Sequence, residues 1–167
     1  MNGKPIDPSR SRASYFTRWT FDLAANTTAF TQSRLWDRPA DFFDVDPRFL
    51  TRSYRHGFMA AKSGDGPFDM IAHINHRTGE VATYQVPPGG TVQEPTFVPR
   101  SPGAPEGDGF LMFVVNWPQD RVADLLILDT ADITRGPVAS VHLPIPLRMA
   151  FHNKYISGAE LAQRAQP

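Results

Sequence analysis

The sequence predicts an all-β fold, and three features of its 167 residues support this prediction. Twelve glycines and sixteen prolines divide the chain into short segments. The segments between them are either apolar throughout or alternate between apolar and polar residues, over roughly five to nine positions. They recur about every 8 to 12 residues, a spacing that is typical of an antiparallel sandwich, barrel or propeller.

We expect strands at ten places, in the order in which the apolar segments occur along the chain. The expected ranges are 16–24, 29–35, 53–61, 68–75, 80–86, 94–99, 109–117, 122–129, 137–142 and 148–152. Residues 1–15 contain no such segment and are expected to be irregular. Because 167 residues suit one core of ordinary size, residues 1–167 are predicted to form a single domain.

Turn and capping chemistry predicts three further features. Thr78 and Gly79 separate an apolar segment from an alternating one, so we expect a hairpin in which the glycine takes a positive φ. Residues 100–109, RSPGAPEGDG, are rich enough in Pro and Gly to predict a surface loop. Ser157 and Glu160 have the spacing of a capping box, which predicts a short helix and tail within 157–167.

Charge balance and the lack of cysteine exclude several kinds of partner and site. The 17 basic and 17 acidic side chains give no net charge, so neither nucleic acid nor an anionic membrane surface is favoured as a partner. Without cysteine there are no disulfides, thiolate zinc sites or cysteine nucleophiles, and a metal must be held by His, Asp or Glu. We see neither a signal peptide nor the roughly 20 apolar residues of a transmembrane segment, and therefore expect a cytoplasmic protein.

Among the five histidines, His152 has the most unusual setting. It ends an apolar run in LRMAFHNKY, where a neutral imidazole needs a partner for its second nitrogen, and a carboxylate suits that role. His73 and His76 are three residues apart, so on a strand they point to opposite faces, and we expect turn and surface roles instead of a metal site. His56 and His142 lie in strand-like segments without a nearby acid and are expected to be structural.

Two acidic residues, Glu94 and Asp41, stand among apolar neighbours in QEPTFV and PADFFDV. Burial of a carboxylate without a hydrogen bond is costly, so each is expected to have a specific partner. A metal-bound histidine commonly donates its other N–H to a carboxylate, which fixes the tautomer of the ring. His152 with one of these acids could form such a pair. A core histidine beside an unrelated structural acid is the alternative that spacing leaves open.

Several motifs in succession make the chain resemble a known family. The segments LTRSYRHGFMA, EPTFVPRSPGAPEGDGFLMFVV, DLLILDTADITRGPVASVHLP and AFHNKY are similar to the C-terminal third of the carotenoid cleavage oxygenases, nearest to bacterial carotenoid and lignostilbene dioxygenases. RWTFDL, at 18–23, resembles the strand with which that region begins. The likeness extends from about residue 17 to about residue 155.

The resemblance implies an open part of a seven-bladed β-propeller, about two to three blades, with a short C-terminal helix. Members of the family hold a non-haem Fe(II) with four histidines, three of which are oriented by glutamates, and use O2 to split a conjugated double bond into two carbonyl products. His152 resembles the last iron ligand, and Glu94 resembles the glutamate that orients it. Asp41 stands where the family has the glutamate of a Glu-Leu-Pro-Arg motif, which implies a second orienting acid.

Two departures from the family pattern accompany the resemblance. The other three iron histidines would lie before residue 1, so the chain holds one ligand of the four. After that ligand, the usual His-Gly-Asn-Trp becomes His152-Asn153-Lys154-Tyr155. Because an unclosed propeller exposes sheet edges, the expected partners are upstream blades or a second copy, besides O2 and an apolar conjugated substrate.

Four aromatic residues are candidates for the wall of an apolar substrate tunnel, with a core position as the alternative for each: Phe58, Phe113, Trp117 and Phe151. The expected activity is that of an Fe(II) dioxygenase acting on carotenoid, apocarotenoid or stilbene-like substrates. The alternative is a non-catalytic β module, either a partial propeller without the other ligands or a self-contained sandwich. The metal content of the protein and the presence of three further histidines upstream separate these functions.

Overall fold

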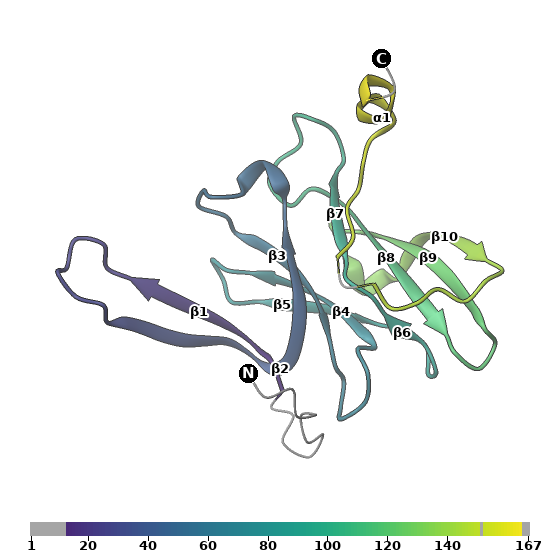
Figure 1. Cartoon of the computed structure of the whole chain (residues 1–167), viewed down its shortest axis with the longest axis horizontal. Helices are drawn as coiled ribbons and strands as arrows, with labels where there is room; N and C mark the ends of the chain where they lie inside the picture. The colour runs from purple at the N-terminus through teal and green to yellow at the C-terminus, as the bar shows by residue number, and fades with distance from the viewer. Residues whose placement is uncertain (1–12, 151, 165–167) are drawn as a thin grey trace, which may run out of the picture.

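Two antiparallel sheets make up the body of the molecule, and the computed structural model describes residues 13–150 and 152–164 (Figure 1). The first sheet has the order β1 (Tyr15–Phe21), β2 (Phe30–Val45), β3 (His56–Ala61), β4 (Met70–Asn75) and β5 (Val81–Gln85). The second has the order β10 (Pro137–Leu143), β9 (Val122–Asp129), β8 (Gly109–Trp117) and β6 (Thr91–Val92), and β7 (Thr96–Pro99) also pairs with β8. The short 3₁₀ helices η2 (Pro47–Phe49) and η3 (Ile133–Arg135) and the helix α1 (Gly158–Arg164) complete the described elements. The predicted all-β class with a short C-terminal helix is confirmed.

The main core lies between the two sheets. It is built from side chains that alternate along the strands, including Phe58 and Ile71 of the first sheet and Phe97, Leu111 and Phe113 of the second, each no more than 2% exposed. The rings of Phe58 and Phe97 stack with their centroids 5.2 Å apart and an interplanar angle of 3°. This core fixes how β3 and β7, on which the candidate site depends, lie against each other.

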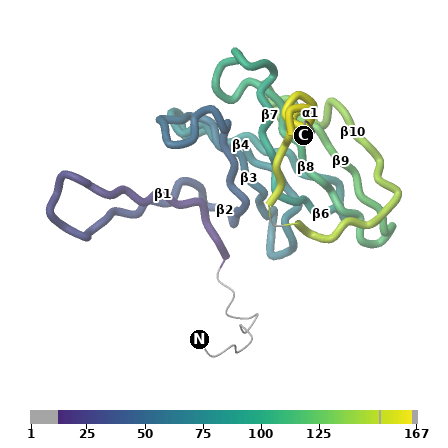
Figure 2. Tube along the Cα trace, turned by 45° about the horizontal axis from the view of Figure 1, so that its top comes forward, coloured from purple at the N-terminus to yellow at the C-terminus, as the bar shows by residue number. Residues whose placement is uncertain are grey.

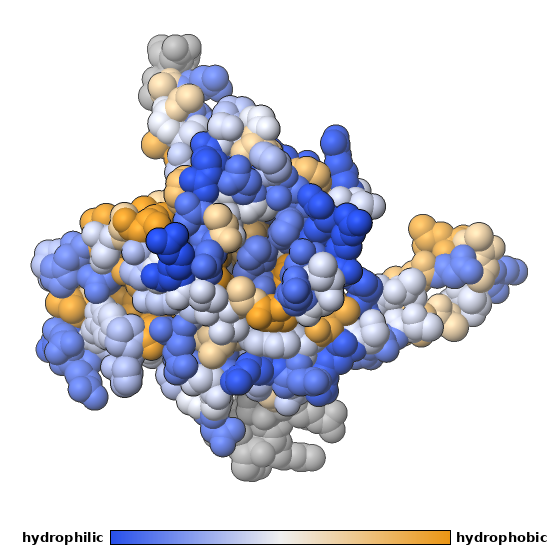
Figure 3. All heavy atoms as spheres, turned by 180° about the vertical axis from the view of Figure 1, so that it is seen from behind, coloured by the Kyte–Doolittle hydropathy of each residue, from blue (hydrophilic) through white to orange (hydrophobic). Residues whose placement is uncertain are grey.

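The strand β1 and the first half of β2 form a hairpin arm that projects from the body (Figures 1 and 2). Near the body, Phe16 and Leu35 pack on the face of the first sheet that points away from the main core. Toward its end the arm exposes apolar side chains, namely Trp19 (58%), Phe21 (55%), Leu23 (96%) and Phe30 (47%). Figure 3 shows the end of the arm coloured as hydrophobic surface.

Each sheet contains a β-bulge beside the boundary between the two sheets. In the first, Asp41 pairs with Ala60 and Asp44 with Phe58, so three steps along β2 oppose two along β3. In the second, Val92 pairs with Val115 and Thr96 with Met112, so four steps oppose three along β8. Each bulge therefore inserts one extra residue, which bends the strand and re-aims the side chains near it.

The predicted connections are confirmed. Gly79 has a φ of +77°, and its N–H donates to the Asn75 carbonyl at 2.7 Å, closing the hairpin between β4 and β5. In the loop at residues 100–108, carbonyl groups accept hydrogen bonds from the Arg48 guanidinium. In the capping box, the Glu160 N–H donates to the Ser157 hydroxyl at 3.2 Å, and the Ser157 N–H donates to the Glu160 carboxylate at 3.1 Å.

Two expectations about strands are wrong. The described residues of 148–152 carry no strand, because Pro144 and Pro146 interrupt any ladder before them and side chains hold this segment instead. β2 continues to Val45, well beyond the expected end at residue 35, although Pro39 lies within it. The carbonyl of Pro39 accepts a hydrogen bond from the Lys62 N–H, so this proline still bonds to the neighbouring strand's end although it has no N–H to donate. No described helix is long and apolar enough to cross a membrane.

The Gly107→Ala change is expected to destabilise the protein more than Gly79→Ala. Both glycines have a positive φ, +75° and +77°, but a Cβ on Gly107 would lie 2.6 Å from Cγ of His56, whereas a Cβ on Gly79 meets nothing within 4 Å. Gly79→Ala should cost about 1–2 kcal/mol of unfolding free energy from backbone conformation alone, and Gly107→Ala roughly 1–3 kcal/mol more from the clash. Urea denaturation of both variants measures this difference, and equal losses would contradict it.

Candidate functional site

The Glu94 side chain lies at the second bulge and contacts the C-terminal tail, which we define as residues 144–157. Its carboxylate is only 14% exposed. Oε2 accepts the Asn153 N–H at 2.8 Å, and Nδ2 of Asn153 donates to the Glu94 carbonyl at 3.1 Å. Nδ1 of His152 lies 3.5 Å from the same Oε2. The structure therefore brings together the two residues that the sequence paired across the chain.

The His152 ring is held on one side only. Its side chain is 89% exposed, and its contact with Glu94 runs through Nδ1, so Nε2 is the nitrogen left without a partner among the described residues. Asn153, which replaces the glycine of the family pattern, does not have a positive φ. The backbone at this position consequently does not use the conformational freedom of glycine, and the Asn153 side chain instead makes the bond to Glu94.

The acid that lies beside Glu94 is Asp44 rather than Asp41. Oδ2 of Asp44 accepts the Phe97 N–H at 2.8 Å, which links β2 to β7. Burial raises the pKa of the Asp44 carboxyl, the hydrogen bond from Phe97 opposes this shift, and the negative charge of Glu94 adds to it. Asp41 is exposed, and its carboxylate accepts the Ser14 hydroxyl at 3.1 Å and the Phe42 N–H at 2.9 Å. No recorded bond of Asp41 within the described residues reaches His152, and its orienting role stays a prediction.

Sequence reasoning missed Asp44 because the bulge cannot be read from the alternation of residues. Phe42, at the bulge, has a φ of +56°, which is rare for a bulky residue. Its ring packs edge-on against Phe68 with the centroids 5.4 Å apart. Because of the extra residue, the side chains of Asp41 and Asp44 point in different directions, and only Asp44 points toward β7. A phenylalanine pair between two aspartates gives no sequence signal for this arrangement.

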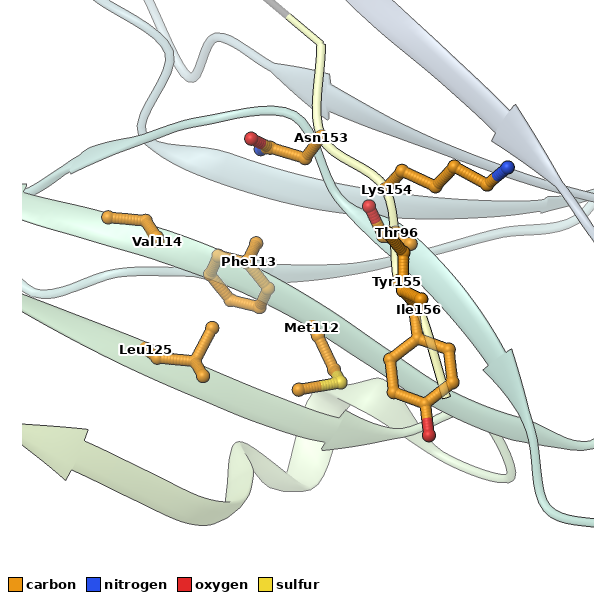
Figure 4. Close-up of a pocket in the computed structure, with 9 residues that line it drawn as sticks. All are labelled: Thr96, Met112, Phe113, Val114, Leu125, Asn153, Lys154, Tyr155 and Ile156. Carbon is orange, nitrogen blue, oxygen red and sulfur yellow. The ribbon is translucent and has the colours of Figure 1, made fainter. Parts of the chain in front are cut away.

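Two cavities flank the tail. One, of about 260 Å³, lies between the tail and the strands β8 and β9, with the labelled side chains of Figure 4 around it: Thr96, Met112, Phe113, Val114, Leu125, Asn153, Lys154, Tyr155 and Ile156. The other, of about 430 Å³, is lined by Asp44, Pro47, Thr96, Phe97, Pro99, Asn153, Lys154, Tyr155 and Glu160. Both share the residues that follow His152, so an apolar compound bound in either would lie next to the Glu94 contact.

Of the four predicted tunnel residues, Phe113 lines the smaller cavity. Phe58 is fully buried in the core and lines neither of the two cavities. Nε1 of Trp117 donates to the Asp124 carboxylate at 2.6 Å, and Trp117 lines neither of the two cavities. Phe151 lies outside the described residues. Phe58 and Phe113 are both buried in the main core, so the geometry favours a core role for each, and a contact with substrate stays a prediction.

A second group of polar side chains surrounds His56. Its Nδ1 lies 2.9 Å from Nε2 of His73, and its N–H donates to Oε1 of Glu106 at 3.1 Å. The Arg55 N–H donates to the same oxygen. Burial opposes ionisation of Glu106, but the hydrogen bonds from Arg55 and His56 lower the pKa of its carboxyl. This arrangement attaches the loop at 100–108 to the start of β3.

The expectation that His56 and His142 lack a nearby acid is wrong. Glu106 reaches His56 from a loop 50 residues away, and Asp124 of β9 lies 3.0 Å from Nδ1 of His142. His73 and His76 do lie in different surroundings, as predicted, but the turn and surface role expected for His73 is wrong, because this residue lies within β4 and is partly buried. His76 faces the rings of Phe43 and Tyr54 and is contacted by the Arg18 guanidinium at 3.3 Å, whereas His73 faces His56. The described residues contain no group of three His, Cys, Asp or Glu side chains that could hold a metal.

Stability should fall between about pH 6.5 and about pH 4 through His73. Burial, together with the charge of His56, lowers the pKa of His73 from 6.5 to about 4, so folding favours its neutral form. The stabilisation is present above pH 6.5 and is lost as the pH falls, because the unfolded chain takes up the proton first, an effect of roughly 2–3 kcal/mol. Denaturation at several pH values measures it. His73→Gln should flatten the profile, and the exposed control His142→Gln should not; equal slopes in wild type and His73→Gln would contradict the assignment.

Comparison with known proteins finds relatives along nearly the whole chain. A family model described as RPE65, retinal pigment epithelial membrane protein, matches residues 2–157. Lignostilbene-alpha,beta-dioxygenase isozyme III of Sphingomonas paucimobilis is 32% identical over 174 residues, which cover 96% of this chain and 35% of the relative. Isoeugenol monooxygenase of Pseudomonas nitroreducens is 36% identical over 168 residues, which cover 92% of this chain and 34% of the relative.

The structural comparison agrees with the comparison of sequences. The crystal structure of lignostilbene dioxygenase from Pseudomonas brassicacearum is similar with a TM-score of 0.82 and 31% sequence identity, over 89% of this chain and 33% of that chain. The chain therefore spans about a third of the length of the relatives it matches. The predicted partial propeller is confirmed.

Proposed function

Because the chain belongs to the carotenoid oxygenase family, we propose that it forms part of a non-haem Fe(II) oxygenase that cleaves a conjugated carbon–carbon double bond with O2. The substrates are of the carotenoid, apocarotenoid or stilbene-like class, and the relatives named for lignostilbene and isoeugenol favour an aryl alkene among these. One oxygen atom of O2 goes to each alkene carbon. The double bond is thereby replaced by two carbonyl groups, and no atom is left over.

The contact between His152 and Glu94 is the observation that carries this proposal. With a carboxylate at Nδ1, the nitrogen available to a metal is Nε2, which is the arrangement of an oriented histidine ligand. His152 thus fits one coordination position. The proposal assigns the remaining three histidines to the upstream blades, since the described residues hold no group of three ligands.

When bound, Fe(II) surrounded by neutral imidazoles supplies a centre at which O2 is reduced while the alkene is oxidised. The residues of this chain hold the ligand and the substrate. The Glu94 carboxylate, 3.5 Å from Nδ1 of His152, favours the tautomer with the proton on Nδ1, which would leave Nε2 free for a metal and place negative charge beside the dipositive site. The apolar cavity beside the tail, with Met112 and Phe113 in its wall, binds part of the substrate and excludes water from it.

A non-catalytic module is the second candidate. The 89% exposure of His152 favours it, because a ring in that setting is not enclosed by other ligands within the described residues. Expression of this chain alone and of the chain together with any upstream coding sequence separates the two functions. Iron close to one atom per polypeptide in the longer protein, with carbonyl products from an aryl alkene, supports the oxygenase. The absence of both supports the module.

In the assembled, iron-containing protein, His152→Ala should abolish product formation and lower the iron content. The matched control is His142→Ala, because His142 is also an exposed histidine beside a carboxylate, but it lies on β10 and contacts Asp124, at 3.0 Å, instead of Glu94. Aldehyde yield and iron content by mass spectrometry measure both changes. Normal turnover in His152→Ala would rule out the assignment of this residue as a ligand.

Glu94→Gln should reduce turnover by roughly 10 to 100-fold, because loss of an orienting partner weakens ligand placement and basicity. Glutamine keeps an acceptor oxygen for the Asn153 N–H, so the tail should stay attached. The rate constant and the iron content are measured together. If the rate were unchanged at full iron loading, Glu94 would have no orienting role.

A further inference from the structure

The tail is held to the body by side chains instead of by a sheet ladder. Its described residues carry no strand, yet it crosses the second sheet at the junction of β6 and β7 (Figure 1). Within the described part of the chain, the recorded hydrogen bonds from the tail to the sheets all involve Gln93 or Glu94. These two consecutive residues therefore determine where each tail residue lies.

Gln93 uses both ends of its side-chain amide. Nε2 donates to the Arg148 carbonyl and Oε1 accepts the Ala150 N–H, each at 3.2 Å. The residue is only 2% exposed, and its own N–H donates to the Val114 carbonyl of β8 at 2.9 Å. The Arg148 carbonyl and the Ala150 N–H lie on either side of Met149 in the chain, and a neighbouring strand would bind such a pair of groups. The Gln93 amide thus takes the place of a peptide group of a missing strand.

The bulge explains why Gln93 and Glu94 can serve the same segment. On a regular strand, consecutive side chains point to opposite faces, so one of the two would point away from the tail. The extra residue between Val92 and Thr96 breaks this alternation. Pro95, which is fully buried and has no N–H to donate, follows directly and fixes the bend.

We propose that Gln93 is a positioning residue that sets the register of the tail and so places His152 opposite Glu94, with Asn153 closing the same clamp from the other side. Successive peptide groups of an extended segment point to opposite sides, so a slip by one residue would turn both partners of the Gln93 amide away. A buried amide left without partners is unfavourable, which opposes that slip. A slip by two residues would break both bonds between Asn153 and Glu94.

The chemical consequence of this clamp rests on the proposed function, but the clamp itself does not. Gln93 touches neither a metal nor a substrate, and it acts through the backbone that carries His152. Register is a property of the iron-free chain. It can be measured whether or not the assembled protein turns out to be an oxygenase.

Amide hydrogen exchange in the Gln93→Met variant tests the proposal. Methionine has nearly the same size and removes both hydrogen-bonding groups. The Ala150 amide should exchange about tenfold faster or more, and the Asn153 amide, which binds Glu94 and not Gln93, should accelerate as well. Amides within β8 and β9 report that the sheets remain intact. The control Gln85→Met removes a glutamine whose Nε2 donates to Asp69, 3.3 Å away, and should leave both tail amides unchanged.

The Asn153 amide distinguishes a register clamp from a local contact. If only Ala150 accelerates, Gln93 makes a local bond and the proposal fails, and it fails equally if neither amide responds. Asn153→Ala, at an exposed position, provides the reciprocal test if Gln93→Met does not fold: it removes the bond to the Glu94 carbonyl and should accelerate Ala150 exchange. An unchanged Ala150 amide in that variant would also overturn the proposal.

The assembled protein gives a further measurement. Gln93→Met should lower both iron content and turnover, because the segment that carries His152 is no longer fixed, and it should raise the KM for the alkene, because the same segment forms one wall of the cavity. If His152→Ala and Glu94→Gln were silent in the same protein, the proposed function would fail while the exchange result still stood. If those two variants were impaired and Gln93→Met fully active at full iron loading, the positioning role would fail.

Discussion

The Glu94 carboxylate is the group on which the placement of the tail depends. It is 14% exposed at the boundary of the two sheets, and a charge in that position needs donors to offset its loss of hydration. The acid beside it, Asp44, offers none. The Asn153 N–H of the tail donates to Glu94, and Nδ1 of His152 lies 3.5 Å away. The need of this partly buried carboxylate for hydrogen bonds thus helps to attach the tail, which has no strand pairing of its own.

The bulge in the first sheet turns Asp44 toward Glu94, which increases the need of the Glu94 carboxylate for hydrogen-bond donors. The Glu-Leu-Pro-Arg motif of the family has an arginine at the position of Asp44, and a guanidinium there would supply positive charge near Glu94. The aspartate adds negative charge instead. Two features relieve the repulsion between Asp44 and Glu94. Burial raises the pKa of the Asp44 carboxyl, which favours its neutral form, and the Phe97 N–H donates to the same group. The contacts recorded for Glu94 within the described residues nevertheless run to the tail, through Asn153 and His152.

The turn and capping features could be predicted from the sequence, whereas the directions of side chains at the bulge and the contacts between distant residues could not. Gly79 and the capping box at Ser157 follow from the intrinsic preferences of a few adjacent residues, and both are confirmed. The strand expected at 148–152 is wrong because an apolar run does not distinguish a paired strand from an extended segment that side chains hold, and what holds this one is an amide 55 residues away. The sequence favours Asp41 over Asp44 because the alternation of apolar and polar residues does not reveal an inserted residue. Residues 100–109 are predicted to form a surface loop, yet the Glu106 side chain within them is only 6% exposed because the loop folds back onto His56.

Two exposed histidines within the described residues contact a carboxylate, and they differ in how the backbone beside them is held. Nδ1 of His142 lies 3.0 Å from Asp124, but the two residues belong to paired strands, and that acid also accepts from Trp117. Within the described residues, this acid and the sheet ladder together fix that ring. The His152 contact is longer, at 3.5 Å, but its acid also binds the backbone of the next residue, and the neighbouring Gln93 binds the backbone of the residues before it. His152 has no ladder beside it, so within the described residues the side chains of Gln93 and Glu94 place its backbone from both sides.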